Sequence, residues 1–167
     1  RALAETELPP RVFNPTHVNR RKALFTEAVE LARAGCTVDI TAFPVAEDED
    51  AWSADVALKL YLESGAPDER VTISSDGGGC LPVFNDQGEM LHMDIGRPSG
   101  LLTALQGVLD AGIPLDLALP AFTSNAATLL RLHDRGRISE GRVADLIVLD
   151  DDNGISDVMV GGRWHVQ

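Results

Sequence analysis

The sequence predicts an α/β fold of the barrel type, in which parallel strands alternate with helices. Apolar residues recur at helical spacing from Arg21 to Ala34, and Gly35 supplies the stop expected just past a helix end. A β-branched run follows at 37–41, and a second helix and strand pattern leads to 71–75. Strands that alternate with helices in this order lie parallel, so they deliver their loops to one common edge.

The other elements follow from turn residues and spacing. Pro9 and Pro10 end one segment, and the Asn85-Asp-Gln-Gly turn between two apolar runs is typical of a hairpin. The expected elements are a helix tail at Leu3 to Leu8, a short strand at Arg11 to Asn14, helices at 21–34, 51–64 and 98–110, a helix at 114–133 interrupted at Pro120, strands at 37–41 and 71–75, and a hairpin at 81–95.

The pattern changes after Arg135. Short alternating runs at 144–149, 155–160 and 163–166 are separated by a polar turn and a pair of glycines, which is typical of antiparallel strands. We therefore expect two domains, an α/β part over 1–135 and β-strands of a second, small domain over 136–167.

The composition excludes several function classes. The chain has 167 residues, with 26 acidic against 14 basic side chains and a net charge of -12. Nucleic-acid binding needs clustered Lys and Arg to replace counterions, so nucleic acid is not an expected partner. No apolar run is long enough to cross a bilayer. Two cysteines, Cys36 and Cys80, are too few for a disulfide framework, so the predicted location is the cytoplasm.

His17 and Arg20 follow the first predicted strand. Imidazole is a good neutral ligand for zinc-type metals, and the end of a strand fixes its direction. A lone histidine is more often structural or exposed, which is the alternative for His17. The planar guanidinium of Arg20 suits a carboxylate, and its alternative role is a surface ion pair.

Asp76 follows the strand at 71–75, within Ser74-Ser-Asp-Gly-Gly-Gly79. It is either a turn residue, with glycines that permit positive φ, or a carboxylate that binds metal and moves a proton. The glycine run lacks the lysine of a phosphate loop. Cys80 is close enough to line such a site, whereas the three remaining histidines are expected to be structural or exposed. They are His92, His133 and His165.

Three segments carry a resemblance to a known family. Residues 136–150, Gly-Arg-Ile-Ser-Glu-Gly-Arg-Val-Ala-Asp-Leu-Ile-Val-Leu-Asp, are similar to the C-terminal signature of the metal-dependent amidohydrolase superfamily. Pro-Thr-His-Val-Asn-Arg at 15–20 and Ser-Ser-Asp-Gly-Gly-Gly at 74–79 narrow this to the isoaspartyl dipeptidases, or β-aspartyl peptidases. The ordered match covers essentially the whole chain.

This resemblance implies the C-terminal part of a distorted (β/α)8 TIM-like barrel, about strands six to eight, followed by strands of a small β-sandwich. It also implies two zinc ions and hydrolysis of isoaspartyl dipeptides. His17, on strand six, would bind one zinc. Asp76, on strand eight, would bind the other and carry the proton from the attacking water to the leaving amine. Arg20 would hold a substrate carboxylate, and Cys80 occupies a substrate-contact position that is often Ser.

The remaining family ligands, a His-x-His pair, a bridging lysine and another histidine, are absent from these 167 residues. One hypothesis is therefore that the chain is part of a larger zinc-dependent isoaspartyl dipeptidase, inactive in isolation. The alternatives are another amidohydrolase, such as a cyclic-amide hydrolase or N-acyl deacetylase, and a truncated non-catalytic piece that folds only by association. The expected partners are a dipeptide substrate and either further copies of the chain or a missing N-terminal part preceding Arg1.

Overall fold

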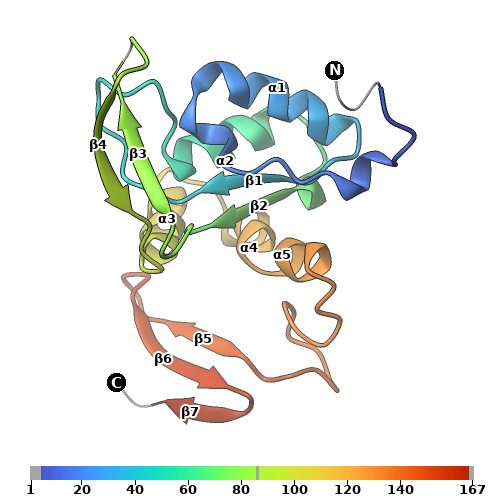
Figure 1. The fold of residues 1–167 in the computed structure, drawn as a ribbon. Helices are drawn as coiled ribbons and strands as arrows, with labels where there is room; N and C mark the ends of the chain where they lie inside the picture. Colours follow the sequence, from blue (N-terminus) through green and yellow to red (C-terminus); the bar gives the residue numbers. More distant parts are fainter. Residues whose placement is uncertain (1–4, 86, 166–167) are drawn as a thin grey trace.

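The computed structural model describes residues 5–85 and 87–165, and its centre is a pair of parallel strands with helices packed against it (Figure 1). Helices α1 and α2 pack on β1, and α4 and α5 pack on β2. The elements are α1 Lys22–Arg33, β1 Val38–Thr41, α2 Ala54–Glu63, β2 Val71–Ser74, β3 Cys80–Phe84, β4 Met90–Ile95, α3 Gly100–Asp110, α4 Leu115–Phe122, α5 Ser124–Leu129, β5 Leu146–Leu149, β6 Ile155–Val160 and β7 Arg163–His165.

Strands β1 and β2 pair in parallel, with Val38 opposite Val71 and Thr41 opposite Ser74. Each strand alternates an apolar residue with a polar one, so the apolar side chains all point to one face of the pair. That face is covered by the helices and forms the core. The buried cluster includes Phe25 and Ala32 of α1, Leu58 and Tyr61 of α2, Val38, Ile40, Val71 and Ile73 of the strands, and Val108 and Ala118 of α3 and α4.

The strand predicted at Arg11 to Asn14 is wrong, because Pro10–Val12 form a 3₁₀ helix instead. Proline fixes φ near the value of a helical turn and cannot donate to a ladder. The chain becomes extended at Phe13 and runs beside β1. The Asp39 N–H donates to the Pro15 carbonyl at 2.9 Å. The predicted helix tail at Leu3 to Leu8 is also wrong for Glu5 to Leu8, which form a turn and a bend, and its first two residues lie outside the described ranges.

Helix α2 begins at Ala54, three residues later than predicted. The predicted interruption at Pro120 is displaced, since Pro120 lies inside α4 and the break occurs at Thr123. A proline disturbs the helix on its N-terminal side, so the chain continues helically after it until Thr123 leaves the helical region. The following helix ends at Leu129 rather than at residue 133 because Arg131, with φ 57°, adopts the left-handed conformation that stops a helix.

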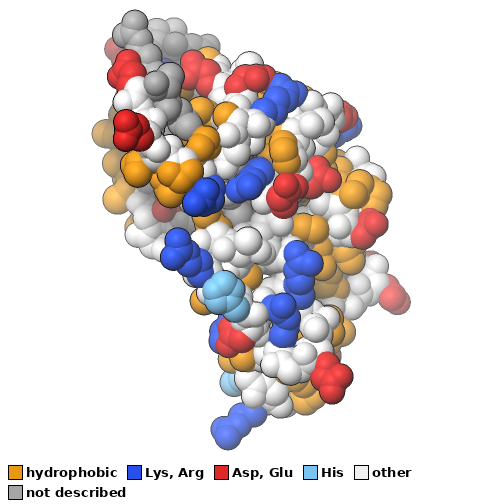
Figure 2. All heavy atoms as spheres, turned by 90° about the vertical axis from the view of Figure 1, so that its right-hand side faces the viewer, with side chains coloured by type: hydrophobic (Ala, Val, Ile, Leu, Met, Phe, Trp, Pro, Cys, Tyr) orange, Lys and Arg blue, Asp and Glu red, His pale blue; other side chains and the backbone are white. Residues whose placement is uncertain are grey.

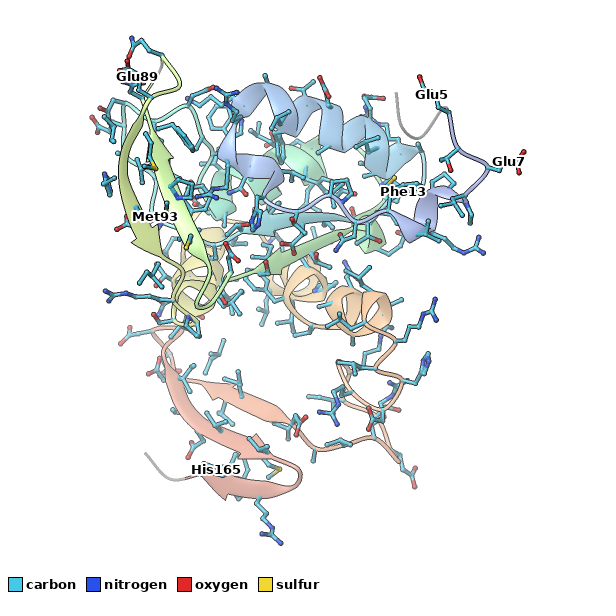
Figure 3. All side chains as sticks on the ribbon, viewed as in Figure 1. Glu5, Glu7, Phe13, Glu89, Met93 and His165 are labelled. Carbon is cyan, nitrogen blue, oxygen red and sulfur yellow. The ribbon has the colours of Figure 1, made fainter. Side chains whose placement is uncertain are left out.

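The predicted hairpin is present as the antiparallel pair β3 and β4, although Asp86 in its turn lies outside the described residues. Strands β5, β6 and β7 form a separate antiparallel sheet, again as predicted, with Val166 not described. Figure 3 places His165 on β7, far from the hairpin that carries Glu89 and Met93. None of the helices within 5–85 and 87–165 has the length and apolar character needed to cross a membrane.

Figure 2 shows the face on the right of Figure 1, where acidic and basic side chains are interspersed with exposed hydrophobic ones. The exposed apolar side chains are most concentrated on the hairpin and the C-terminal sheet. They include Met90, Leu91, Met93, Ile95, Ile147, Val160 and Trp164.

Candidate active site

His17 and Asp76 occupy corresponding places at the ends of neighbouring extended segments. His17 directly precedes the 3₁₀ helix Val18–Arg20, and Asp76 comes two residues after β2. Both have a positive φ, 58° for His17 and 49° for Asp76. Only two other non-glycine residues of the described chain share this conformation. A left-handed backbone is costly for residues with a side chain and is concentrated at functional sites, which singles these two out.

The two side chains converge. His17 Nε2 lies 3.9 Å from Asp76 Oδ2, a separation too long for a direct hydrogen bond. Their side chains are 37% and 26% exposed, so both retain access from outside. The other ring nitrogen of His17, Nδ1, shares a 2.7 Å hydrogen bond with Thr41 Oγ1. An imidazole anchored through one nitrogen, with a carboxylate beside the other, fits a metal centre.

Arg20 lies one turn beyond His17. Its Nη2 donates a 3.2 Å hydrogen bond to the Pro82 carbonyl, and its guanidinium lies 5.5 Å from the centre of the Phe43 ring. Among the described residues no carboxylate forms an ion pair with it. The guanidinium is therefore held in place by a carbonyl and an aromatic ring, with its charge available to an anionic ligand.

Cys80 begins β3 and is exposed. It follows a tight turn in which the Gly79 N–H donates to the Asp76 carbonyl at 2.8 Å. Gly96, at the end of the hairpin, packs on the same turn, and a Cβ at that position would overlap the Asp76 carbonyl oxygen. The glycines therefore allow the turn after β2, the start of β3 and the end of β4 to meet beside Asp76.

Sequence reasoning missed three functional candidates, and two of them, Asn19 and Thr41, have no exposed surface. Asn19 Oδ1 accepts from the Thr41 N–H at 2.9 Å, and Asn19 Nδ2 donates to the carbonyls of Thr41 and Trp52 at 3.0 and 2.7 Å. The sequence offered a signal for Asn19, because this residue belongs to the segment 15–20 that resembles the isoaspartyl dipeptidases. A fully buried asparagine two residues from a candidate ligand indicates a structural role beside the site.

Asp39 is the third missed residue. Its carboxylate oxygens each accept a 2.6 Å hydrogen bond, from the hydroxyls of Thr72 and Ser74 on the neighbouring strand. Burial raises the pKa of Asp39 above its ordinary value, although these hydroxyls oppose the change. The alternation of polar residues in two otherwise apolar strands is the signal, because strands buried on both faces are usually apolar throughout.

The other three histidines are exposed, as predicted. His92 Nε2 lies 3.3 Å from Asp94 Oδ2 on β4, and His133 follows α5 in an irregular segment. Within the described ranges no group of three or more His, Cys, Asp or Glu side chains is arranged to hold a metal ion. His17 and Asp76 thus supply two donors, and a complete metal centre needs further ligands.

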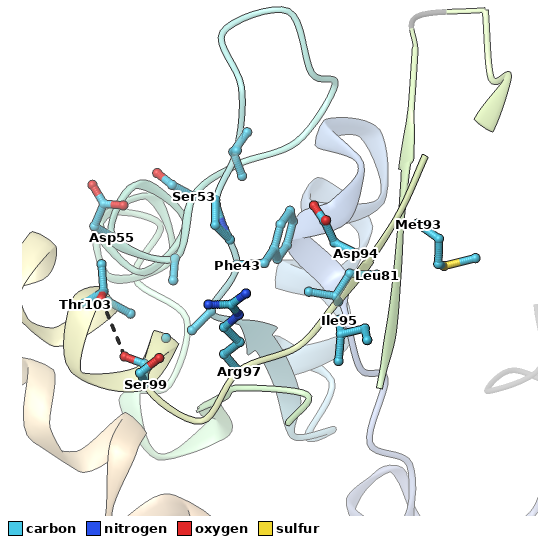
Figure 4. A pocket seen from close by; sticks show the side chains of 16 residues that line it. Phe43, Ser53, Asp55, Leu81, Met93, Asp94, Ile95, Arg97, Ser99 and Thr103 are labelled. Carbon is cyan, nitrogen blue, oxygen red and sulfur yellow. Dashed lines mark hydrogen bonds between the residues drawn. The ribbon is translucent and has the colours of Figure 1, made fainter. Parts of the chain in front are cut away.

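A cavity of about 680 Å³ is lined in part by Phe43, the residue whose ring lies beside the Arg20 guanidinium. Figure 4 shows Arg97 projecting into it below Phe43, with Leu81 and Ile95 from the hairpin along one wall and the first turns of α2 and α3 opposite. The cavity is thus bounded by the loop after β1, by the hairpin of β3 and β4, and by the starts of α2 and α3.

The comparisons with known proteins agree on the fold. The model of the Amidohydrolase family matches residues 15–165. The β-aspartyl dipeptidase of Fervidobacterium islandicum AW-1, in complex with β-Asp-Leu, has a TM-score of 0.83 and 35% identity and covers 97% of this chain. An adenine deaminase of Methylobacterium nodulans is 31% identical over 139 residues, 82% of this chain. The N-acetylglucosamine-6-phosphate deacetylase of Pasteurella multocida, with a TM-score of 0.60 and 14% identity, shows only a shared fold.

These matches confirm the predicted fold class, an α/β barrel fold of which this chain carries a part. The chain spans 41% of the dipeptidase chain and 21% of the adenine deaminase. Because the chain matches less than half of each of these two relatives, the activity of the whole relative is not assigned to this chain.

Proposed function

The chain belongs to the amidohydrolase family, and we propose that within it the chain forms part of a metal-dependent isoaspartyl dipeptidase. The observation that carries the proposal is the convergence of His17 and Asp76, with the free charge of Arg20 one turn away. The similarity to a β-aspartyl dipeptidase over 97% of this chain supports the same substrate class.

The proposed metals are two zinc ions, as amidohydrolases generally use metal ions. A bound zinc pair lowers the pKa of a metal-bound water and polarises an amide carbonyl. His17, through Nε2, and Asp76, through Oδ2, would hold these ions together with ligands from outside this chain. The hydrogen bond between Nδ1 and Thr41 leaves Nε2 as the ring nitrogen that can bind a metal.

Asp76 is also the proposed acid-base group. Its carboxylate would accept a proton from the attacking water and donate it to the leaving amine as the amide bond breaks, which needs no second base. Arg20 would bind a substrate carboxylate through its planar fork. Cys80, at the end of the glycine turn, is the proposed small side chain that contacts the substrate.

The test uses the gene product purified from its source organism, in the length in which it is made, with β-Asp-Leu as substrate. Asp76→Asn retains the shape of the side chain but cannot accept the proton. We expect kcat to fall by at least about 100-fold, the usual scale for a lost acid-base group. Near-normal turnover would return Asp76 to the role of a turn residue.

Arg20→Ala tests the carboxylate clamp in the same assay. Hydrogen bonds to charged groups contribute about 1.5–3 kcal/mol, so we expect kcat/KM to fall about ten- to a hundredfold. Arg11→Ala is the matched control, because Arg11 is an exposed arginine on the 3₁₀ helix at Pro10–Val12. An equal effect of both substitutions would contradict the clamp.

A second candidate function is adenine deamination, which the sequence relatives favour. Adenine has no carboxylate, so this reaction gives Arg20 no anionic partner. Measuring ammonia release from adenine beside β-Asp-Leu hydrolysis separates the two. Deamination of adenine without dipeptide hydrolysis would overturn the proposed substrate while leaving the family unchanged.

A further inference from the structure

We propose that Thr41 and Asn19 are positioning residues that fix the His17 imidazole in the tautomer with its proton on Nδ1, so that Nε2 stays free to bind a metal. This inference rests on the proposed function for the metal. The geometry on which it depends lies entirely within this chain.

Thr41 offers His17 a fixed partner. Its side chain belongs to β1 and has no exposed surface, and Oγ1 lies 2.7 Å from His17 Nδ1. When Nδ1 carries the proton and donates it to Thr41 Oγ1, the lone pair of Nε2 points toward the Asp76 carboxylate, 3.9 Å away. The opposite tautomer would put the proton on Nε2, the nitrogen nearer Asp76, and block it as a metal ligand.

Asn19 in turn fixes Thr41. The backbone N–H and C=O of Thr41 both bond to the Asn19 side chain, which takes the place of a neighbouring strand at this point. The Asn19 amide also reaches the Trp52 carbonyl, and the Trp52 N–H donates to the Asn19 carbonyl at 2.9 Å. The turn that carries His17 is therefore tied to the end of β1 and to the segment that leads into α2.

The hydrogen bonds of Asn19 to Thr41 and Trp52 account for the left-handed backbone of His17. A left-handed conformation is unfavourable for a histidine and persists only where its surroundings impose it. Asn19, two residues along, is held by four hydrogen bonds to Thr41 and Trp52, so the intervening turn has little freedom. These hydrogen bonds thereby fix the orientation of the His17 imidazole.

The first measurement is the tautomer of His17 in the metal-free protein, by long-range proton–nitrogen NMR. The expected result is a proton on Nδ1. A proton on Nε2 would overturn the proposal without any substitution, whatever reaction the protein catalyses. A protein that holds this tautomer but does not hydrolyse β-Asp-Leu would contradict the proposed function alone.

The second measurement is zinc affinity, by competition with a coloured chelator. Thr41→Val removes the hydroxyl with little change in shape. We expect zinc to bind at least about tenfold more weakly, the scale for removing a partner of a metal-binding histidine. Thr41→Ser retains the hydroxyl and should restore both the affinity and the tautomer. Unchanged zinc affinity in a folded Thr41→Val protein would overturn the proposal.

Asn125 provides the matched control for Asn19. It is also buried, and its Nδ2 donates to the carbonyls of Asp68 and Val71 at 2.8 and 2.9 Å, at the far end of β2. Asn19→Asp and Asn125→Asp each remove two such donors. Both should lower the unfolding temperature, but only Asn19→Asp should weaken zinc binding and change the His17 tautomer. An equal loss of zinc affinity in both would reduce Asn19 to a structural role.

Discussion

The Tyr61 side chain has no exposed surface, and its hydroxyl donates a 2.8 Å hydrogen bond to the Pro67 carbonyl. Burial, reinforced by the charges of Asp68 and Glu69, raises the pKa of Tyr61 above its ordinary value. The phenol therefore stays protonated in the folded protein at a pH where it ionises in the unfolded chain.

Tyr61→Phe tests this bond by denaturant unfolding at several pH values. At neutral pH we expect a loss of about 0.5–1.5 kcal/mol, the net contribution of one hydrogen bond. Because the folded pKa is raised, the stabilisation from Tyr61 is complete below pH about 10 and declines as the pH rises above it. The difference between the two proteins should therefore shrink in alkali. A difference that grows above this pH would contradict the raised pKa.

At the scale of elements, the base of the hairpin is a closely packed junction. The strands β3 and β4 return to the turn after β2, where the Gly78 N–H donates to the Gly96 carbonyl and the Gly96 N–H donates to the Gly79 carbonyl, each at 2.9 Å. The contact is so close that only glycine fits at Gly96. The hairpin is thereby joined to the segment that carries Asp76, although most of its side chains are exposed.

Gly96→Ala should push the Asp76 carbonyl aside, costing about 1–3 kcal/mol of unfolding free energy, as overpacking does, and lowering kcat/KM for β-Asp-Leu. Gly107→Ala in α3 is the control. A Cβ there meets Asp55 at an ordinary 3.4 Å, and alanine favours a helix interior over glycine by about 0.5–1 kcal/mol. Denaturant unfolding and turnover should therefore separate the two substitutions. Equal unfolding free energies and equal turnover in the two variants would contradict this prediction, because they would show that the backbone at the hairpin base moves to accommodate a Cβ.

At the scale of the whole molecule, burial is divided unequally. The buried hydrophobic cluster extends from Val18 to Ala121, whereas none of the residues of β5, β6 and β7 is buried. One described contact across this division is the 3.1 Å bond from Gln106 Nε2 to the Asn153 carbonyl. We propose, as the sequence predicted, that 1–135 and 136–167 are distinct domains.

Hydrogen exchange followed by mass spectrometry tests this division. Amides of β1 and β2 lie in the core and should exchange only when it opens, whereas those of β5 to β7 should exchange much sooner. Matching protection in both sheets would show that they unfold as one unit and would contradict the boundary near Arg135.

By itself, the sequence determined the order of helices and strands, because periodicity and turn residues are local properties. It also determined that Asp76 follows a strand, because loops follow directly from strands, whereas the strand expected before His17 does not form. Its errors fell at proline-rich segments and helix ends. The 3₁₀ helix at Pro10–Val12 and the break at Thr123 depend on small conformational preferences that neighbouring contacts override.

Only the tertiary structure decided which polar groups meet. The Thr41 hydroxyl reaches His17 across 24 positions of sequence, and the Asp39 carboxylate reaches Thr72 across 33. Such pairs depend on the register of parallel strands joined by a helix, which no local pattern specifies. The sequence thus identified the candidate ligands, while the fold identified the residues that aim one of them.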